Sequence, residues 1–222
     1  MLTVVKVGGG LWRAEGDAAL RSLCATLGDL GRRHPLLVVP GGAGFADAVR
    51  DADRRFSLAA ASAHRMAILG MEQFGWVLSE LIPHAVRCAE LADVREHAGR
   101  RTAVLLPASV PLAGLPASWQ VTSDAIAAWV AGQVGAGRLV LVKALDGLFA
   151  DGELLARLSV AELGALRPGG VDEYLPAVLE GADFETWVIG GRDPARVVEL
   201  LESGTTVGTR IAPTGLVPWR HG

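Results

Sequence analysis

Short apolar runs alternate with longer helical patterns along this chain. The runs are rich in Val, Leu and Ile, which is typical of strands buried on both faces. They span residues 2–7, 36–40, 101–108, 138–144 and 184–190. The helical patterns span residues 17–33, 45–55, 59–82, 123–135, 173–181 and 194–202. This order predicts an α/β fold in which an open, mainly parallel sheet is covered by helices on both faces.

Glycines cluster where four of these runs end. They are Gly8, Gly9 and Gly10, then Gly41, Gly42 and Gly44, then Gly147, and finally Gly190 and Gly191. The carboxyl ends of strands in such a sheet form a ligand crevice, where glycine lets backbone amides approach a phosphate. An ordinary tight turn would explain any one cluster, but four together favour a phosphate cradle. The P-loop motif is absent, and GAGFAD at 42–47 is a weak dinucleotide fingerprint.

The chain contains only two lysines, Lys6 and Lys143, among its 21 Lys and Arg residues. Both lie in apolar runs, VVKV and VLVKALDG. A compositional bias toward arginine is one interpretation. The other is that these two positions require a compact ammonium, because a guanidinium is larger, planar and differently hydrated.

The stretch WQVTSDAIAAWVA at 119–131 supplies a partner for Lys6. Thr122 or Ser123 is predicted as a helix N-cap, which places Asp124 in the first turn, where the helix dipole favours a carboxylate. Acidic first turns are also routine helix chemistry. However, an ammonium at a buried strand end is costly unless an anion faces it. We therefore predict that Asp124 holds and orients Lys6.

Composition excludes several classes of function. With 222 residues, half of them hydrophobic, the chain can bury one large core or two small ones. A net charge of −3 without a basic run argues against a nucleic-acid partner. Cys24 and Cys88 lack a paired metal-binding spacing, which favours a reduced, cytoplasmic setting. No apolar stretch approaches the roughly 20 residues of a membrane span, and no signal peptide is evident.

Five motifs in order resemble the amino acid kinase family, which includes aspartate, acetylglutamate, uridylate and isopentenyl phosphate kinases. They are KVGGG, VVPGGAGFADAVR, VTSDAIAAW, VKALDGLF and VGTRI, and the match runs from about residue 2 to residue 211. The resemblance implies a three-layer αβα kinase domain at 1–212, followed by a C-terminal tail at 213–222. Segments 63–73, 118–124, 171–176 and 188–202 look most like the [5-(aminomethyl)furan-3-yl]methyl phosphate kinases of methanofuran biosynthesis.

The resemblance also implies roles for individual residues. Lys6 matches the catalytic lysine that stabilises the transferring phosphoryl group, and Asp124 matches the aspartate that orients it. The phosphate-binding glycines would be Gly8, Gly9, Gly10, Gly41 and Gly42, with Gly10 in place of the family's usual serine. The nucleotide-binding residues would be Lys143, Asp146, Gly147 and Phe149, with Phe149 in place of tyrosine.

Acceptor recognition is less strongly indicated. Candidate acceptor-binding residues are Arg50, His64, Arg65, Thr122 and Ser123. An arginine suits bidentate binding of a phosphate. For Arg50, His64 and Arg65, a solvated helix face is an equally good explanation.

The leading prediction is an ATP-dependent kinase whose acceptor is a small phosphomonoester, with Mg²⁺ carried by ATP and no metal site of the protein's own. Such an acceptor needs no general base, and no histidine or carboxylate is paired with a nucleophile in the sequence pattern. One alternative is a kinase that phosphorylates a carboxylate. Another is a nucleotide-binding storage or assembly protein without turnover. The resemblance further implies a homo-oligomer.

Overall fold

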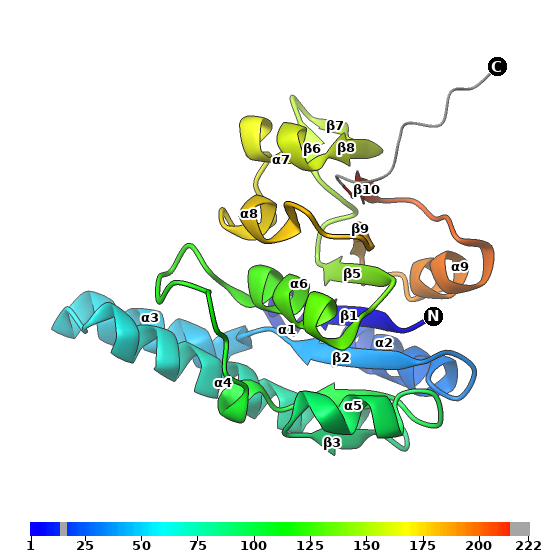
Figure 1. Ribbon diagram of the computed structural model, residues 1–222, viewed down its shortest axis with the longest axis horizontal. Helices are drawn as coiled ribbons and strands as arrows, with labels where there is room; N and C mark the ends of the chain where they lie inside the picture. Colours follow the sequence, from blue (N-terminus) through cyan, green and yellow to red (C-terminus); the bar gives the residue numbers. More distant parts are fainter. Residues whose placement is uncertain (14–16, 214–222) are drawn as a thin grey trace.

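The computed structural model describes residues 1–13 and 17–213 of the chain. Within these residues, one large sheet runs through the molecule in the order β3-β4-β2-β1-β5-β9-β10-β8, and β6 and β7 form a separate hairpin (Figure 1). The strands are β1 (Thr3–Val7), β2 (Leu36–Pro40), β3 (Val86–Cys88), β4 (Ala103–Leu105), β5 (Arg138–Lys143), β6 (Phe149–Ala150), β7 (Glu153–Leu154), β8 (Arg157–Ser159), β9 (Glu185–Gly190) and β10 (Thr209–Ala212).

Helices cover the sheet on both sides (Figure 1). They are α1 (Gly10–Arg13), α2 (Asp17–Leu30), α3 (Ala43–Phe56), α4 (Ala60–Leu81), α5 (Leu91–His97), α6 (Ser123–Val134), α7 (Val160–Leu166), α8 (Leu175–Leu179) and α9 (Ala195–Ser203), with a short 3-10 helix, η1 (Pro107–Ser109). The predicted α/β architecture is therefore confirmed.

The sheet is mainly parallel, as the sequence pattern predicts. Strand β1 pairs in parallel with β2 on one side and with β5 on the other, and β5 continues in parallel to β9. Only the pairing of β10 with β9 is antiparallel within this sheet. Because β1 lies where the chain connections diverge, its carboxyl end is the topological switch point at which ligands bind in open α/β sheets.

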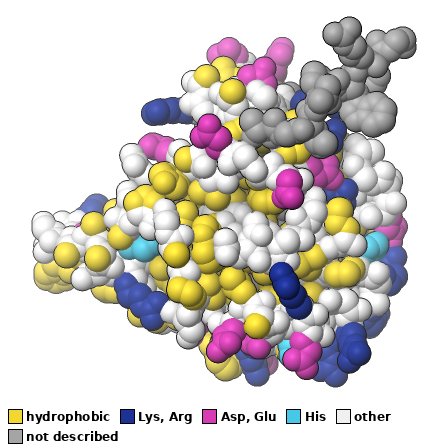
Figure 2. Space-filling model, viewed as in Figure 1, with side chains coloured by type: hydrophobic (Ala, Val, Ile, Leu, Met, Phe, Trp, Pro, Cys, Tyr) yellow, Lys and Arg dark blue, Asp and Glu magenta, His cyan; other side chains and the backbone are white. Residues whose placement is uncertain are grey.

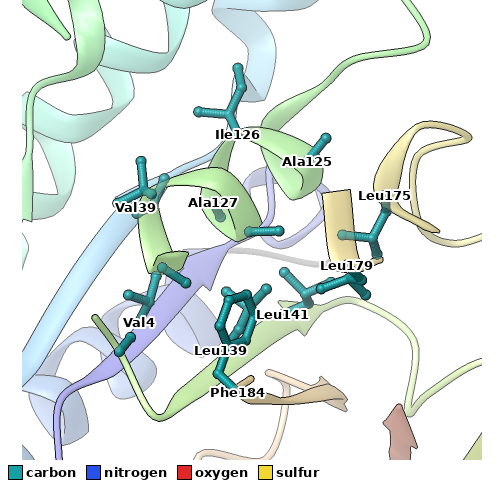
Figure 3. Packing of buried hydrophobic residues seen from close by; sticks show 14 of the residues in the cluster. Val4, Val39, Ala125, Ile126, Ala127, Leu139, Leu141, Leu175, Leu179 and Phe184 are labelled. Atoms are coloured by element: carbon teal, nitrogen blue, oxygen red, sulfur yellow. The ribbon is translucent and has the colours of Figure 1, made fainter. Parts of the chain in front are cut away.

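Two hydrophobic clusters fill the space between the sheet and its helices. On one face, Val4, Leu139 and Leu141 gather between the strands and the helices α6 and α8 (Figure 3). On the other face, residues of α2 and α9 such as Leu27 and Leu200 complete the second cluster. Every residue of β1 and β2 is buried. This double coverage explains why their sequences are continuous apolar runs.

Several predicted boundaries were wrong. The strand expected at 101–108 covers only β4, because Pro107 lacks a backbone N–H and begins η1 instead. The helix expected at 17–33 ends at Leu30, and residues 31–33 form a turn. A Cβ at Gly31 would lie 1.9 Å from the Thr102 hydroxyl oxygen, so only glycine fits at the start of this turn. The helix expected at 173–181 is only α8.

On the face seen in Figure 2, hydrophobic side chains concentrate near the middle and most charged side chains lie toward the margins. No helix among the described residues is long and apolar enough to cross a membrane. The predicted C-terminal tail, apart from Pro213, lies outside the described residues. The extent of the kinase domain at 1–212 stays a prediction.

Candidate active site

Strand alternation places the two lysines on the same face of the sheet. Lys6 follows Val4 by two residues in β1, and Lys143 follows Leu141 by two residues in β5. Alternate residues of a strand face the same side. Val4 and Leu141 belong to the cluster that packs against α6, and Lys6 pairs with Leu141 in the register of the two strands. Both ammonium groups therefore lie at the carboxyl edge of the sheet, beneath the start of α6.

Asp124, in the first turn of α6, forms ion pairs with both lysines. Lys6 Nζ lies 2.8 Å from Asp124 Oδ1, and Lys143 Nζ lies 2.5 Å from Asp124 Oδ2. All three side chains are largely removed from solvent, Lys6 at 4% exposure, Asp124 at 3% and Lys143 at 15%. The structure thus brings Lys6 and Asp124 together, as expected from the sequence. It also places Lys143, to which the family resemblance gave a nucleotide-binding role, in the same cluster.

The cluster shifts the ionisation of its members. Burial disfavours the charge on Asp124, but the positive charges of Lys6 and Lys143 outweigh it and lower the pKa of Asp124 to about 2. Burial, followed by repulsion from Lys6, lowers the pKa of Lys143 to about 8 despite the attraction of Asp124. Asp124 therefore stays ionised at neutral pH, whereas Lys143 can lose its proton in mildly alkaline solution.

This shift predicts a pH dependence of ATP binding. Lys143 is protonated below its pKa of about 8, so raising the pH from 7 to 9 should remove one positive charge beside the expected phosphates and weaken ATP binding. The dissociation constant for ATP, measured by calorimetry across this range, should begin to rise near pH 8. A Lys143→Arg variant, whose guanidinium stays charged, should lack this rise; an equal rise in that variant would contradict the assignment.

Asp172 caps α6 from a distant loop and was missed in the sequence pattern. Its Oδ2 accepts hydrogen bonds from Thr122 N at 3.1 Å, Thr122 Oγ1 at 3.0 Å and Ala125 N at 2.8 Å. Its own backbone N–H donates to Asp124 Oδ2 at 3.2 Å. Thr122 is the N-cap residue, as predicted, but its side chain makes no capping bond. Burial and the charge of Asp124 raise the pKa of Asp172. The position of Asp124 therefore depends on Asp172.

The two glycine turns pack directly against each other. A Cβ at Gly9 would lie 2.6 Å from the backbone of Ala43, and a Cβ at Gly41 would lie 2.9 Å from Gly9 N. Gly8 adjoins the lysines, because its Cβ would lie 3.5 Å from Lys6 Nζ. Only hydrogen leaves enough room at these positions.

Not all of the glycine amides are available to a phosphate. Gly8 N donates to Val142 O and Gly41 N donates to Val7 O, both at 2.9 Å. In the part of the chain that the structure describes, the amides of Gly9, Gly10 and Gly42 donate to no protein acceptor. The predicted cradle is therefore reduced to these three amides and the neighbouring ammonium groups.

A cavity of about 150 Å³ opens beside Gly9, Gly10 and Gly42. Its polar side chains are Arg50, His64, Thr122 and Ser123, all of them predicted acceptor-binding residues. Its apolar wall is formed by Ala46, Ala67, Ile68, Met71, Val121 and Ile126, with Trp119. None of the described residues that line it is Asp or Glu. The cavity therefore suits a small apolar group that carries a negative charge.

The loop between η1 and α6 runs past α3 and α4 (Figure 1), and its residues Trp119 and Val121 line the cavity. Trp119 Nε1 donates to Asp53 Oδ2 at 2.6 Å, and His64 is hydrogen-bonded to the backbone of Ser118. Burial lowers the pKa of His64, although the Ser118 bond opposes the shift. Arg65 does not line the cavity; its guanidinium donates to the Ala108 carbonyl instead.

The other predicted nucleotide residues, Asp146, Gly147 and Phe149, follow β5, and the first two lie against β9 and β10. Asp146 Oδ1 is 2.8 Å from Arg196 Nη1, and a Cβ at Gly190 would come within 2.4 Å of the same oxygen. Gly147 has φ of +158° and packs against Thr209, whose hydroxyl accepts from Leu148 N at 2.8 Å. Phe149 is 37% exposed in β6. This arrangement leaves a nucleotide role for these residues as a prediction.

Comparison with known proteins identifies the family. The model of the amino acid kinase family matches residues 1–183. The chain belongs to the amino acid kinase family. It is 28% identical over 214 residues to the [5-(aminomethyl)furan-3-yl]methyl phosphate kinase of Methanocaldococcus jannaschii, covering 94% of this chain and 96% of that protein. An acetylglutamate kinase of Acidiphilium cryptum is 32% identical over 135 residues, which are 55% of this chain and 44% of that protein.

Solved structures of the family share the fold. The uridylate kinase of Archaeoglobus fulgidus superposes with a TM-score of 0.77 at 21% identity, covering 96% of this chain and all of that one. The UMP kinase of Bacillus anthracis gives 0.74 at 14% identity, with 96% of each chain covered. Because its relatives are kinases, this member of the family is an enzyme that transfers a phosphoryl group.

The site fits that chemistry. Phosphoryl transfer requires in-line positioning and stabilisation of charge on the moving group, with little covalent help from the protein. Buried ammonium groups and unpaired backbone amides provide such stabilisation without reorganisation. Among the described residues, no group of three or more His, Cys, Asp and Glu could hold a metal ion.

Proposed function

We propose that this kinase transfers the γ-phosphoryl group of MgATP to the phosphate of a small, single-ring phosphomonoester and forms a diphosphate. The observation that carries this proposal is the cavity beside Gly9, Gly10 and Gly42, which combines an apolar wall with Arg50 and His64 and has no carboxylate among its described lining residues. Arg50 offers a planar donor for an acceptor phosphate. The acceptor needs no general base, because its attacking oxygen is already ionised.

The size of the cavity supports a single ring. Its volume of about 150 Å³ equals that of an engineered apolar cavity that accepts one benzene molecule. Pockets for larger ligands enclose roughly 300–1,000 Å³. A nucleoside monophosphate, which carries a base as well as a sugar, is a poor match. The similarity to uridylate kinases therefore concerns the fold, and we do not propose a nucleoside monophosphate as the substrate of this chain.

The proposed mechanism assigns a task to each part of the site. The amides of Gly9, Gly10 and Gly42 bind phosphate oxygens at the carboxyl ends of β1 and β2. Lys6 and Lys143 stabilise the negative charge that spreads over the phosphoryl group during transfer, and Asp124 keeps both ammonium groups in place. Gly9, Gly10 and Gly42 line the acceptor cavity, and the adjacent Gly8 adjoins Lys6, so donor and acceptor phosphates can meet at these turns.

The specific acceptor that we propose is [5-(aminomethyl)furan-3-yl]methyl phosphate, in the synthesis of a methanofuran-type one-carbon carrier. The kinase of Methanocaldococcus jannaschii named for this substrate matches nearly the full length of the chain. The furan ring and its phosphate arm agree with the apolar wall and with Arg50, whereas the aminomethyl group of this substrate has no carboxylate partner among the described residues that line the cavity.

A carboxylate acceptor is the second candidate. The acetylglutamate kinase of Acidiphilium cryptum has the higher identity, although it matches only about half of this chain. Arg50 could bind the carboxylate of an amino acid derivative as well as a phosphate.

A coupled ADP-release screen separates the two candidates. We expect strong stimulation of ATP turnover by [5-(aminomethyl)furan-3-yl]methyl phosphate and by benzyl phosphate, and little by glutamate, aspartate or acetylglutamate. The Lys6→Met variant, measured with each compound, gives the background rate of ADP release. Stimulation by a carboxylate alone, with hydroxylamine trapping an acyl phosphate, would contradict the proposal.

Two further features of the protein stay predictions. We propose a homo-oligomer, for which the exposed Met66, Leu69 and Trp76 of α4 offer apolar surface. Sedimentation of the purified chain measures its mass directly. A cytoplasmic location, with no nucleic-acid or membrane partner, is the setting that the composition favours.

A further inference from the structure

Trp119 lines the acceptor cavity, and a residue outside its own loop fixes its position. The loop residues from Val110 to Thr122 contain no strand or α-helix. The indole N–H of Trp119 nevertheless has a charged acceptor on α3, Asp53 Oδ2, at 2.6 Å. Asp53 Oδ1 in turn accepts from Leu58 N at 3.0 Å, which holds this carboxylate at the end of α3. The plane of the indole ring is thus set by α3.

The same ring holds Arg50. The guanidinium carbon of Arg50 lies 4.9 Å from the centroid of the Trp119 ring, within the range of a cation–π contact. Arg50 Nη1 also donates to Asp47 Oδ1 at 3.2 Å, one helical turn earlier in α3. The side chain of Arg50 is 40% exposed. Without the ring, an arginine on a half-exposed helix face would sample several rotamers.

We propose that Trp119 is a positioning residue for the acceptor anion: anchored by Asp53, it holds the Arg50 guanidinium toward the cavity as a preorganised bidentate donor. This inference rests on the proposed function, because it assumes that the cavity takes the acceptor. Arg50 and Asp53 of α3, together with Trp119 of the loop, would make the cavity selective for an anionic group. Preorganisation of this kind raises affinity because less side-chain freedom is lost on binding.

The test measures binding without turnover, so that it does not depend on catalysis. Benzyl phosphate and inorganic phosphate are titrated by calorimetry into the protein in the absence of ATP. Trp119→Leu, which removes both the ring and the Asp53 bond, should weaken binding of both probes by roughly 5- to 30-fold. Trp119→Phe keeps an aromatic face and should recover part of this loss. The affinity for ATP and the melting temperature should stay close to those of the wild type.

Two matched variants serve as controls. Trp129→Phe also removes one indole hydrogen bond, from Trp129 Nε1 to the Ala113 carbonyl, but lies outside the cavity lining. Arg54→Lys changes an exposed arginine of α3 that pairs with Asp51 at the same helical spacing as Arg50 with Asp47. Both should bind the two probes like the wild type, whereas Arg50→Lys should weaken both probes about as much as Trp119→Leu does.

The outcomes separate the inference from the proposed function. Loss of benzyl phosphate binding without loss of inorganic phosphate binding would overturn the positioning role, because the ring would then stack on the ligand itself. Equal losses in Trp129→Phe, or none in Arg50→Lys, would overturn it too. Wild-type protein that binds both probes through Arg50 and Trp119 but phosphorylates neither probe nor the furan phosphate would contradict the proposed function alone.

Discussion

Replacement of Lys6 by alanine is expected to lower kcat by roughly 10²- to 10³-fold, the loss seen when a preorganised donor to transition-state charge is removed. The ammonium is buried, lies 2.8 Å from Asp124 and adjoins Gly8 at the phosphate cradle. Its charge therefore acts in a medium of low dielectric, where it is worth more than in water. Steady-state kinetics with saturating ATP and acceptor measure the effect.

Lys6→Arg should be nearly as inactive as the alanine variant. The larger, planar guanidinium cannot occupy the point that the ammonium fills, because that point is buried and lies 2.8 Å from Asp124 Oδ1. A melting curve like that of the wild type would show that the variant is folded. Near-normal turnover in Lys6→Arg would mean that the pair of lysines reflects composition only.

Replacement of Asp124 by asparagine should affect both stability and activity. It leaves two ammonium groups, almost wholly buried, without their carboxylate, and removing one side of a buried ion pair costs roughly 3–5 kcal/mol. We expect the free energy of unfolding at pH 7, measured by urea titration, to fall by about that amount. We also expect kcat to fall at least as far as in Lys6→Ala.

A compensated variant separates the two effects. Lys6→Met, Asp124→Leu and Lys143→Met together replace the ionic cluster by apolar side chains, which is often neutral or stabilising in buried sites. This triple variant should regain most of the stability lost in Asp124→Asn and remain inactive. If the single Asp124→Asn variant were as stable as the wild type, the cluster could not be the buried, fully paired arrangement described above.

The core of the fold is predictable from the sequence because its signals are local. Strands β1, β2 and β5 are continuous apolar runs, and the long helix α4 shows clear helical periodicity. The elements that were missed are short or lie near the edges of the sheet. Strand β3 has three residues of mixed burial, and β10 turns antiparallel only through its pairing with β9. The sequence of a short strand does not indicate which strand it pairs with.

In the candidate site, too, the residues with a local sequence signal were predicted and those that act through distant contacts were missed. Lys6 and Asp124 could be paired from the sequence because an isolated lysine in an apolar strand requires an anion. The alternation of β1 and β5 would also have placed Lys143 on the same face, but that inference needs the strand order. Asp172 and Trp119 act through contacts with Thr122 and Asp53 that lie 50 and 66 residues away. These contacts depend on loop conformations that residue patterns do not encode.

Phosphorus NMR of the product of the wild-type enzyme, MgATP and [5-(aminomethyl)furan-3-yl]methyl phosphate tests the central claim most directly, because it identifies the bond that forms. We predict two mutually coupled diphosphate resonances in addition to those of ADP, with loss of the phosphomonoester signal. An unchanged phosphomonoester signal, together with an acyl phosphate resonance when acetylglutamate is supplied instead, would contradict the claim and make the protein a carboxylate kinase.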